Sequence, residues 1–308
     1  MPELPEVETI KRDLERCLPG RRILAVKLFS KKTALPGAAF FKSALLNRKI
    51  TGLERRGKLL IIGLDKLGRS KRRPAGDADY LLIHLKMTGQ LIYSDAKQTL
   101  AGGHSDLKVR ASGLNSDSGA REGFPNRHTR AAISLQGGAV LYFNDLRRFG
   151  YMRVVSRAEL DLLLSTNYGP EPLTKAFTVT ALSEILKGKK VKIKALLLDQ
   201  KRVAGLGNIY VDEALYAAKI NPERLAGGLR ELEIVRLYRE ISRLIKTAVK
   251  HRGTTFSDYV DSQGKKGNFS RFLKVYGRQG NPCPECGGVI VKIKLAGRGT
   301  HYCPICQS

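Results

Sequence analysis

The sequence lacks any apolar run that approaches the roughly 20 residues needed to span a bilayer. Its first residues are acidic, and they contain no apolar core of the kind that a secretory signal has. These two absences exclude the membrane-spanning and secreted classes of protein. They predict a soluble chain that works inside the cell, in the cytoplasm.

Acidic residues are scarce. The 308-residue chain has 28 Asp and Glu against 55 Lys and Arg, which gives a net charge of +27. The basic residues are spread along the whole chain and are not gathered on one amphipathic helix, so the expected polyanion is nucleic acid and not a membrane surface. The length is enough for two domains that each bury a core.

Cysteine is also scarce, and four of the five cysteines form two Cys-x-x-Cys pairs: Cys283 with Cys286, and Cys303 with Cys306. The interval 287–302 between the pairs fits a four-thiolate zinc ribbon, which points to metal in a reducing compartment and not to disulfides. Four thiolates leave no open position on zinc, so the metal is expected to be structural. An iron site of the rubredoxin type uses the same ligands and is the alternative. The fifth cysteine, Cys17, is expected to be a buried helical residue.

The N-terminus carries a possible nucleophile. Removal of Met1 would leave the secondary amine of Pro2, followed by carboxylates at Glu3 and Glu6. A secondary amine that attacks a sugar carbon gives an iminium that stays cationic without holding a proton, so it remains an electron sink for later eliminations. The alternative is an ordinary helix start, because Pro and Glu are favoured there.

The first half of the chain is expected to be one helix followed by many short strands. Apolar residues recur at helical spacing over residues 7–18, and Pro19-Gly20 ends the pattern. Segments with the character of strands are 23–29, 50–53, 58–64, 80–85, 90–93, 131–135, 139–143 and 151–155. Many short strands at this spacing suggest a sandwich or barrel. Residues 65–79 and 95–126 show no periodicity and are expected to be long loops.

The second half of the chain changes to helical spacing after Pro170 and Pro172, which mark an expected hinge. Apolar stripes predict bundled helices at 179–186, 193–198, 209–217 and 232–249. The turn from Gly205 to Asn208 feeds a helix and either holds a phosphate oxygen with its backbone N–H groups or simply connects two helices. A polar loop follows at 262–270.

Three further stretches contain basic side chains that are candidates for catalysis or DNA binding. Lys58 follows Arg55-Arg56-Gly57 at a strand start, and Arg298 stands between two glycines in the ribbon hairpin. Both could instead be solvated. The stretch 144–150 places two arginines beside Phe149, either as a wedge that enters a base stack or as a turn capped by Asp145. Residues 287–302 are too few to bury a core, so the metal is expected to be the hairpin's only firm anchor.

The chain resembles the formamidopyrimidine-DNA glycosylases over nearly all of its length. The segments that carry the resemblance are residues 1–9, Lys58 after its basic pair, His84 to Gly89, Asp145 to Gly150, Gly169 to Leu173, Gly205 to Tyr210, Val275 to Gly280 and the ribbon with Arg298. Each is short, but their ordered occurrence is specific. The family implies a bifunctional repair enzyme that removes oxidised purines such as 8-oxoguanine and formamidopyrimidines from double-stranded DNA, and then cleaves the strand by β,δ-elimination.

The resemblance assigns a function to particular residues. Pro2 would form the Schiff base with the sugar, with Glu3 as proton donor; Lys58 and Arg298 would donate the protons for β- and δ-elimination. The implied DNA-binding residues are His128, Arg147, Lys189, Asn208, Met87, Phe149 and Tyr276, of which Met87, Arg147 and Phe149 would fill the hole left by the everted base. The loop at 262–270 would close over the lesion.

The resemblance also implies an α+β fold and a monomer that binds no membrane. A catalytic β-sandwich with an N-terminal helix would occupy 1–165 and a hinge 166–176. A helix-two-turn-helix DNA-binding domain would occupy 177–274, and a zinc ribbon with one zinc ion 275–308. The insertions 65–79 and 95–126 make the first domain longer than is usual in the family, and they put the strand boundaries and the alignment of His128 in question. The first insertion has a net charge of +2 and the second a net charge of 0, so neither is expected to clamp DNA.

Two other functions fit parts of the sequence. An endonuclease VIII-like enzyme for oxidised pyrimidines shares the Pro2-Glu3 chemistry, but the Leu4 to Val7 continuation and the loop at 262–270 favour purines. A zinc-ribbon protein that only binds nucleic acid fits the composition equally well. Such a binder has no need of a free Pro2 amine.

Overall fold

The computed structural model describes residues 2–66, 78–103, 124–254 and 268–308. The chain divides into two compact units, residues 1–162 with 254–267 and residues 163–253 with 268–308. The domain boundaries and the hinge expected from the sequence remain predictions. Most of the insertion 65–79, most of the insertion 95–126, and the loop 262–267 lie outside the described residues.

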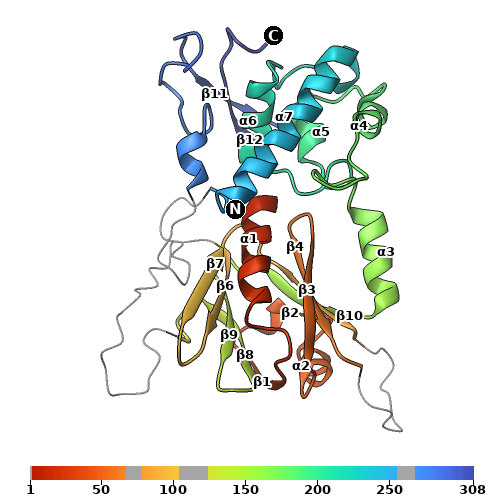
Figure 1. Cartoon of the computed structure of the whole chain (residues 1–308), viewed down its shortest axis with the longest axis vertical. Helices are drawn as coiled ribbons and strands as arrows, with labels where there is room; N and C mark the ends of the chain where they lie inside the picture. The colour runs from red at the N-terminus through yellow and green to blue at the C-terminus, as the bar shows by residue number, and fades with distance from the viewer. Residues whose placement is uncertain (1, 67–77, 104–123, 255–267) are drawn as a thin grey trace. The chain divides into compact units, whose positions relative to one another are not determined.

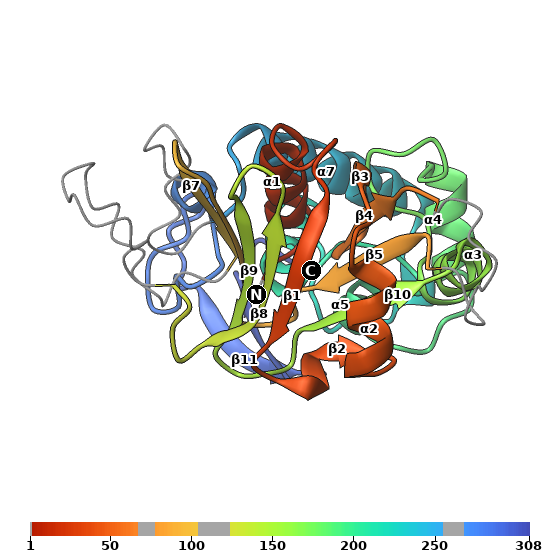
Figure 2. The ribbon, with the colours of Figure 1, turned by 90° about the horizontal axis from the view of Figure 1, so that it is seen from below.

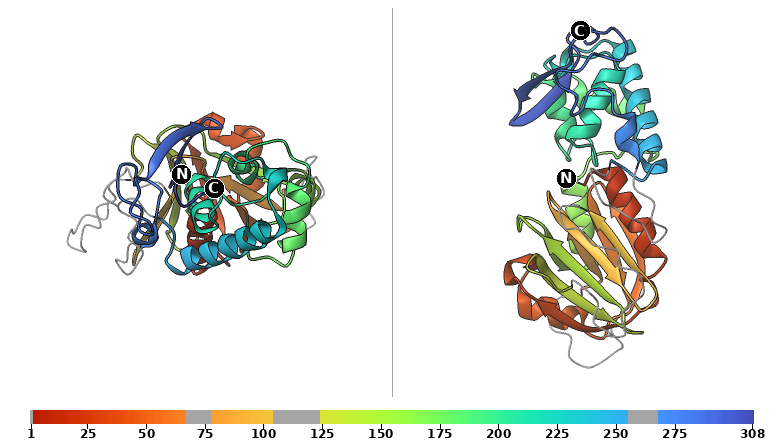
Figure 3. Two further views of the ribbon diagram at one scale, coloured as in Figure 1. Left: turned by 90° about the horizontal axis from the view of Figure 1, so that it is seen from above. Right: turned by 90° about the vertical axis from the view of Figure 1, so that its left-hand side faces the viewer.

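The first unit contains two five-stranded sheets that share one hydrophobic core. The first sheet has the order β1 (Ile23–Leu28), β8 (Thr129–Leu135), β9 (Val140–Asp145), β6 (Gly89–Ser94), β7 (Thr99–Gly103). The second has the order β2 (Ala34–Leu35), β10 (Tyr151–Val155), β5 (Tyr80–His84), β4 (Leu59–Leu64), β3 (Ile50–Arg56). Figure 2 and the right view of Figure 3 show the two sheets layered face to face. The predicted β-sandwich is therefore confirmed.

Helix α1 (Leu4–Glu15) packs against β7 of one sheet and β3 of the other (Figure 1). It begins three residues earlier than the apolar pattern suggested, because the backbone N–H of Glu3 donates to the Glu6 carboxylate at 2.8 Å and so caps the first turn. The helix ends at Glu15. Cys17 lies half-buried in the turn that follows, so the prediction of a buried helical cysteine was wrong.

Several elements of the first unit were not predicted. β7 lies inside the stretch 95–126 that was expected to be a loop. Its small residues look like a loop in the sequence, but a Cβ on Gly102 would come within 2.4 Å of the Ile10 side chain, so the glycine lets α1 pack closely on the strand. Also missed were η1 (Lys31–Thr33), β2, α2 (Ala38–Leu45) and α3 (Arg157–Asn167).

The second unit is built from helices and one hairpin. The helices are α4 (Val179–Leu186), α5 (Ile193–Leu198), α6 (Asn208–Ala217) and α7 (Glu231–Lys250), with short turns η2 (Ala226–Gly228) and η3 (Phe269–Phe272). The hairpin consists of β11 (Val291–Leu295) and β12 (Arg298–Tyr302). All four predicted helices are confirmed, and α6 is buried from Ile209 through Tyr216. No helix among the described residues is both long and apolar enough to cross a membrane.

Candidate functional site

The start of the chain is buried and held by a carboxylate. Pro2 is buried two residues before the start of α1, and Glu3, which lies between them, is only 1% exposed. One oxygen of Glu6 accepts from the Glu3 N–H at 2.8 Å, and the other accepts from the Thr254 N–H at 2.7 Å and its hydroxyl at 3.0 Å. Glu6 therefore fixes the backbone beside Pro2 to the segment at Thr254. Met1 lies outside the described residues.

Lys58 occupies the tight turn between β3 and β4, where Gly57 has a φ of +56°. Arg55 connects this turn to α1, because its Nε donates to Glu8 at 2.9 Å and its Nη1 to the Gly57 carbonyl at 2.9 Å. Burial raises the pKa of Glu8, but its ion pairs with Arg55 and Arg12 outweigh burial and hold that pKa below the ordinary value. Lys58 is 6% exposed, so it is not a solvated lysine.

Met87, Arg147 and Phe149 form one cluster, here called the Arg147 cluster. The guanidinium of Arg147 lies 5.0 Å from the ring centroid of Phe149, and its Nη1 lies 3.2 Å from the sulfur of Met87. The Phe149 side chain is 54% exposed. The structure thus gathers three predicted gap-filling residues from two separate turns.

The turn that carries Arg147 is held by the buried carboxylate of Asp145. One Asp145 oxygen accepts from the Gly150 N–H at 2.7 Å, and the other accepts from the Thr88 hydroxyl. That hydroxyl oxygen accepts from the Arg147 N–H at 2.9 Å. Asp145 therefore caps the turn, and the same turn presents Arg147 and Phe149. A turn capped by Asp145 and a wedge of Arg147 and Phe149 are thus compatible interpretations of this stretch.

His128 is buried beside the start of β8, and its Nε2 accepts from the Arg127 Nε–H at 2.9 Å. Burial, followed by the charges of Arg127 and Arg130, lowers the pKa of His128. Burial and the two neighbouring guanidinium groups therefore favour the neutral form of this imidazole.

In the second unit, Asn208 begins α6 and contacts the hairpin. Its Nδ2 donates to the Gly299 carbonyl at 2.9 Å, and its Oδ1 has no hydrogen-bond partner in the described part of the chain. The Gly205 N–H donates to the Gln200 side chain at 2.8 Å, so this backbone donor of the glycine turn is already used. Lys189 lies half-buried in the turn after α4.

Two buried acids hold the segments that carry the other predicted residues. Glu213 holds the segment of Tyr276, and Asp212 holds the strand of Arg298. Glu213 accepts the backbone N–H groups of Lys274, Val275 and Tyr276 at 2.8–2.9 Å. Burial raises the pKa of Glu213 more than these three donors lower it. The Tyr276 ring lies 4.9 Å from the His301 ring, and Arg298 opens β12 as an exposed residue.

The four predicted ligands gather in space. The sulfur atoms of Cys283, Cys286, Cys303 and Cys306 all lie within 4.8 Å of one another. The Cys283–Cys306 and Cys286–Cys303 sulfur distances are 3.8 and 3.5 Å. Tetrahedral zinc with Zn–S bonds of about 2.3 Å needs sulfurs about 3.8 Å apart, so the residues fit the ion. The Tyr216 hydroxyl lies 3.3 Å from the Cys283 sulfur.

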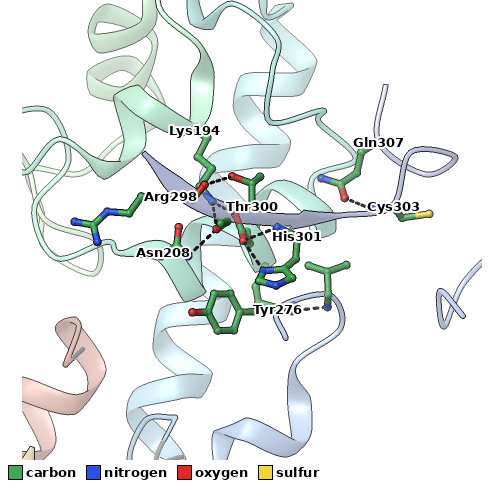
Figure 4. A network of polar contacts seen from close by, with 12 residues as sticks. Lys194, Asn208, Tyr276, Arg298, Thr300, His301, Cys303 and Gln307 are labelled. Carbon is green, nitrogen blue, oxygen red and sulfur yellow. Dashed lines mark hydrogen bonds and ion pairs between the residues drawn. The ribbon is translucent and has the colours of Figure 1, made fainter. Parts of the chain in front are cut away.

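The hairpin has a second anchor besides the cysteines. The Lys194 ammonium lies 2.6 Å from Asp212 Oδ1 and 3.2 Å from the Gly299 carbonyl oxygen. The second oxygen of Asp212 accepts from the His301 N–H at 2.9 Å (Figure 4). The expectation that the metal is the hairpin's only firm anchor was therefore wrong, because helices α5 and α6 also bind β12 through these buried charges.

Sequence reasoning missed Lys194, Asp212 and Glu213. Asp212 and Glu213 are adjacent acids in the middle of an apolar helix, and a helix that is buried all round cannot send both of them to solvent. That pattern was the available signal. For Lys194, nothing in the local sequence distinguishes it from the exposed Lys192 two residues earlier.

Models of known protein families match three parts of the chain. The "Formamidopyrimidine-DNA glycosylase N-terminal domain" matches residues 1–152, the "Formamidopyrimidine-DNA glycosylase H2TH domain" matches 168–260, and the "Zinc finger found in FPG and IleRS" matches 280–308. With the geometry of the four cysteines, the last match identifies a site for one structural zinc ion.

Individual relatives match the chain from end to end. Formamidopyrimidine-DNA glycosylases of Pelotomaculum thermopropionicum and Desulforamulus reducens are 41% and 43% identical, each covering 100% of this chain and 99% of the relative. A Lactococcus lactis FPG mutant in complex with Fapy-dG containing DNA has a TM-score of 0.82 at 34% identity, with 100% of both chains covered. MutM in complex with carbocyclic 8-oxo-G containing DNA has a TM-score of 0.79 at 34% identity over the same coverage. From the first residue to the last, this chain therefore belongs to the formamidopyrimidine-DNA glycosylase family.

Proposed function

We propose that this protein removes oxidised purines, 8-oxoguanine and formamidopyrimidines, from double-stranded DNA and then cleaves the strand as an AP lyase. In the first step the amine of Pro2 bonds to the sugar carbon C1′, and the bond from C1′ to the damaged base breaks. The base leaves with the electron pair of that bond and takes up the proton that the Pro2 nitrogen loses. Glu3 donates a proton at the sugar, the ring opens, and a cationic iminium remains on Pro2.

The iminium then drives two eliminations. Loss of the C2′ proton breaks the C3′–O bond, and loss of the C4′ proton breaks the C5′–O bond, with the electrons held each time in the conjugated iminium. Lys58 donates the proton for the first leaving phosphate, and Arg298 does so for the second. Hydrolysis of the iminium returns the free amine of Pro2.

The observation that carries this proposal is the burial of Pro2, Glu3 and Lys58 in one unit. A protein that only binds nucleic acid gains nothing from burying a lysine that solvent would stabilise better. Here Lys58 lies in a turn that Arg55 ties directly to the helix following Pro2. The burial of these groups supports chemistry at the N-terminus.

The exposed Arg147 cluster supports the DNA-binding part of the proposal. Eversion of a base costs a few kcal/mol, and a side chain that fills the gap offsets that cost. Phe149 with a guanidinium against its ring is such a side chain. In the second unit, Lys189, Asn208, Tyr276 and Arg298 would contact the phosphates, and the whole protein would act as a monomer.

The test is borohydride reduction of the protein mixed with duplex DNA that carries 8-oxoguanine opposite cytosine. We expect a covalent adduct that maps to Pro2 by mass spectrometry. Duplex DNA with thymine glycol at the same position is the matched substrate, and faster trapping there would favour the oxidised-pyrimidine alternative. If no adduct forms while a control enzyme is active in the same assay, the result would refute the proposal and favour a protein that only binds DNA.

A further inference from the structure

Arg298 stands on a hairpin that has little core of its own. The buried apolar cluster around the cysteines is small: among the described residues it contains Val275 and Ile290 of the ribbon and Tyr216 of α6. Arg298 itself is exposed, and its side chain points away from the buried residues of β12 (Figure 4). Something other than apolar packing must therefore fix the backbone next to this arginine.

The backbone of β12 is fixed one and three residues after Arg298. The Gly299 carbonyl oxygen accepts from Lys194 Nζ at 3.2 Å and from Asn208 Nδ2 at 2.9 Å, which uses both of its lone pairs. The His301 N–H donates to Asp212 Oδ2 at 2.9 Å, and the His301 ring nitrogen lies 3.4 Å from the same oxygen. Two points on one strand define both its position and its direction.

The two charges behind this strand are fully removed from solvent. The side chains of Lys194 and Asp212 are each 0% exposed, and their 2.6 Å contact joins α5 to α6. A buried ion pair adds little net stability, because desolvation of the two charges offsets most of their attraction. Its larger effect is to fix the local structure, because few arrangements of the surrounding groups satisfy every hydrogen bond of a buried charge.

We propose that the buried Lys194–Asp212 pair positions Arg298 for the second elimination. The pair acts on Arg298 through Gly299 and His301, and it does so independently of the zinc ion. Lys194 and Asp212 are positioning residues and do not touch the DNA. This inference rests on the proposed function, because it assigns the pair to one step of that reaction.

The main test uses the double variant Lys194→Met/Asp212→Asn. Methionine keeps the volume of the lysine stem, and asparagine keeps an oxygen for the His301 N–H, so both buried charges are removed together. The matched control is Lys192→Met, which removes a lysine of the same segment whose 2.7 Å pair with Glu223 lies on the surface. All proteins are assayed on duplex DNA with an abasic site.

In the double variant we expect the ratio of δ- to β-elimination product to fall about tenfold or more, since a displacement near 1 Å at a reacting group can cost that much. Borohydride trapping at Pro2 should keep the parent's rate, and bound zinc should stay at one ion per chain. Lys192→Met should keep the parent's product ratio. Retention of the parent ratio in a folded double variant would overturn the proposal.

Adding Arg298→Ala distinguishes an effect that acts through Arg298 from a general loss of structure. If the pair acts through Arg298, then Arg298→Ala with and without the double variant should give the same δ-elimination rate, within about twofold. Additive losses would overturn the proposal. If the double variant does not fold, Asp212→Asn alone removes only the carboxylate charge and should shift the product ratio in the same direction; an unchanged ratio would contradict us. Failure of the parent to trap at Pro2 would instead refute the proposed function.

Discussion

The two units hold their candidate catalytic residues in different ways. In the first unit, Pro2 and Glu3 precede a helix whose apolar face enters a large core shared by two sheets. In the second unit, Arg298 opens a strand of a small hairpin that is fixed by four cysteines and a buried ion pair. Where the chain is too short to bury a core, metal and charge replace apolar packing.

This difference predicts different kinds of failure. The first unit keeps its geometry as long as its core is intact, so its chemistry should be lost mainly through a chemical change at the amine. The hairpin of the second unit depends on its cysteines and a few polar contacts, so single substitutions should disorganise it. The predictions below start from the largest expected effect.

Blocking the N-terminus should abolish base removal and strand cleavage and leave DNA affinity largely intact. Pro2 reacts only as a free amine, whereas affinity comes mostly from phosphate contacts spread over many basic residues. Retention of Met1 should have the same effect as an N-terminal tag. The measurements are product formation on 8-oxoguanine DNA and the dissociation constant at one fixed salt concentration.

The matched control for the blocked protein carries the same tag at the C-terminus and should keep both activities. Mass spectrometry must show the state of residue 1 in each sample. Full base removal by a protein that still carries Met1 would refute Pro2 as the nucleophile, and with it the view that the first unit is organised around its N-terminus.

Loss of one zinc ligand should give the next largest effect. Cys283→Ala should release about one zinc per chain and loosen the hairpin, and cleavage of lesion DNA should fall about a hundredfold or more, since even residues that only support a metal ligand cost 10- to 100-fold. Zinc is measured by atomic absorption. Cys17→Ala, in the first unit, is the control and should keep the zinc. A zinc-free Cys283→Ala that cleaves like the parent would show that the reaction does not need the metal, and that the contacts of β12 with α5 and α6 are enough to hold the hairpin.

Much of the fold was predictable because local patterns and tertiary packing agree. The helices α4 to α7 repeat apolar residues at helical spacing and are buried on those faces. The two Cys-x-x-Cys pairs fix a metal site by spacing alone. The strand β7 was missed because its glycines are explained only by the close approach of Ile10, which the local sequence does not record.

The site was predictable only in part, for a similar reason. A resemblance can assign Arg298 a function, but it does not show what holds Arg298 in place. Lys194 and Asp212 are 18 residues apart and meet only because α5 packs on α6. Long-range pairs of this kind depend on the tertiary structure, so composition and periodicity cannot reveal them.

The exposed Arg147 cluster should give a moderate effect. Phe149→Ala should slow base removal about tenfold, because stacking against a base contributes about 1–3 kcal/mol. Phe29→Ala is a close control, since Phe29 is also exposed in the first unit and also has a cation, Lys27, 5.2 Å from its ring centroid. Single-turnover excision of 8-oxoguanine is the measurement. Equal effects of the two substitutions would mean that Phe149 has no special place on the DNA.

The smallest effect should come from the hydrogen bond between the Tyr216 hydroxyl and the Cys283 sulfur, a 3.3 Å contact that joins α6 to the metal site. One such bond contributes about 0.5–1.5 kcal/mol, so Tyr216→Phe should speed zinc release to a chelator about two- to tenfold and leave the fold unchanged. Tyr302→Phe, a half-buried tyrosine on the same hairpin, is the control and should release zinc like the parent. If Tyr216→Phe also released zinc at the parent's rate, the hydroxyl would not support the metal, and the cysteines would hold it without help from α6.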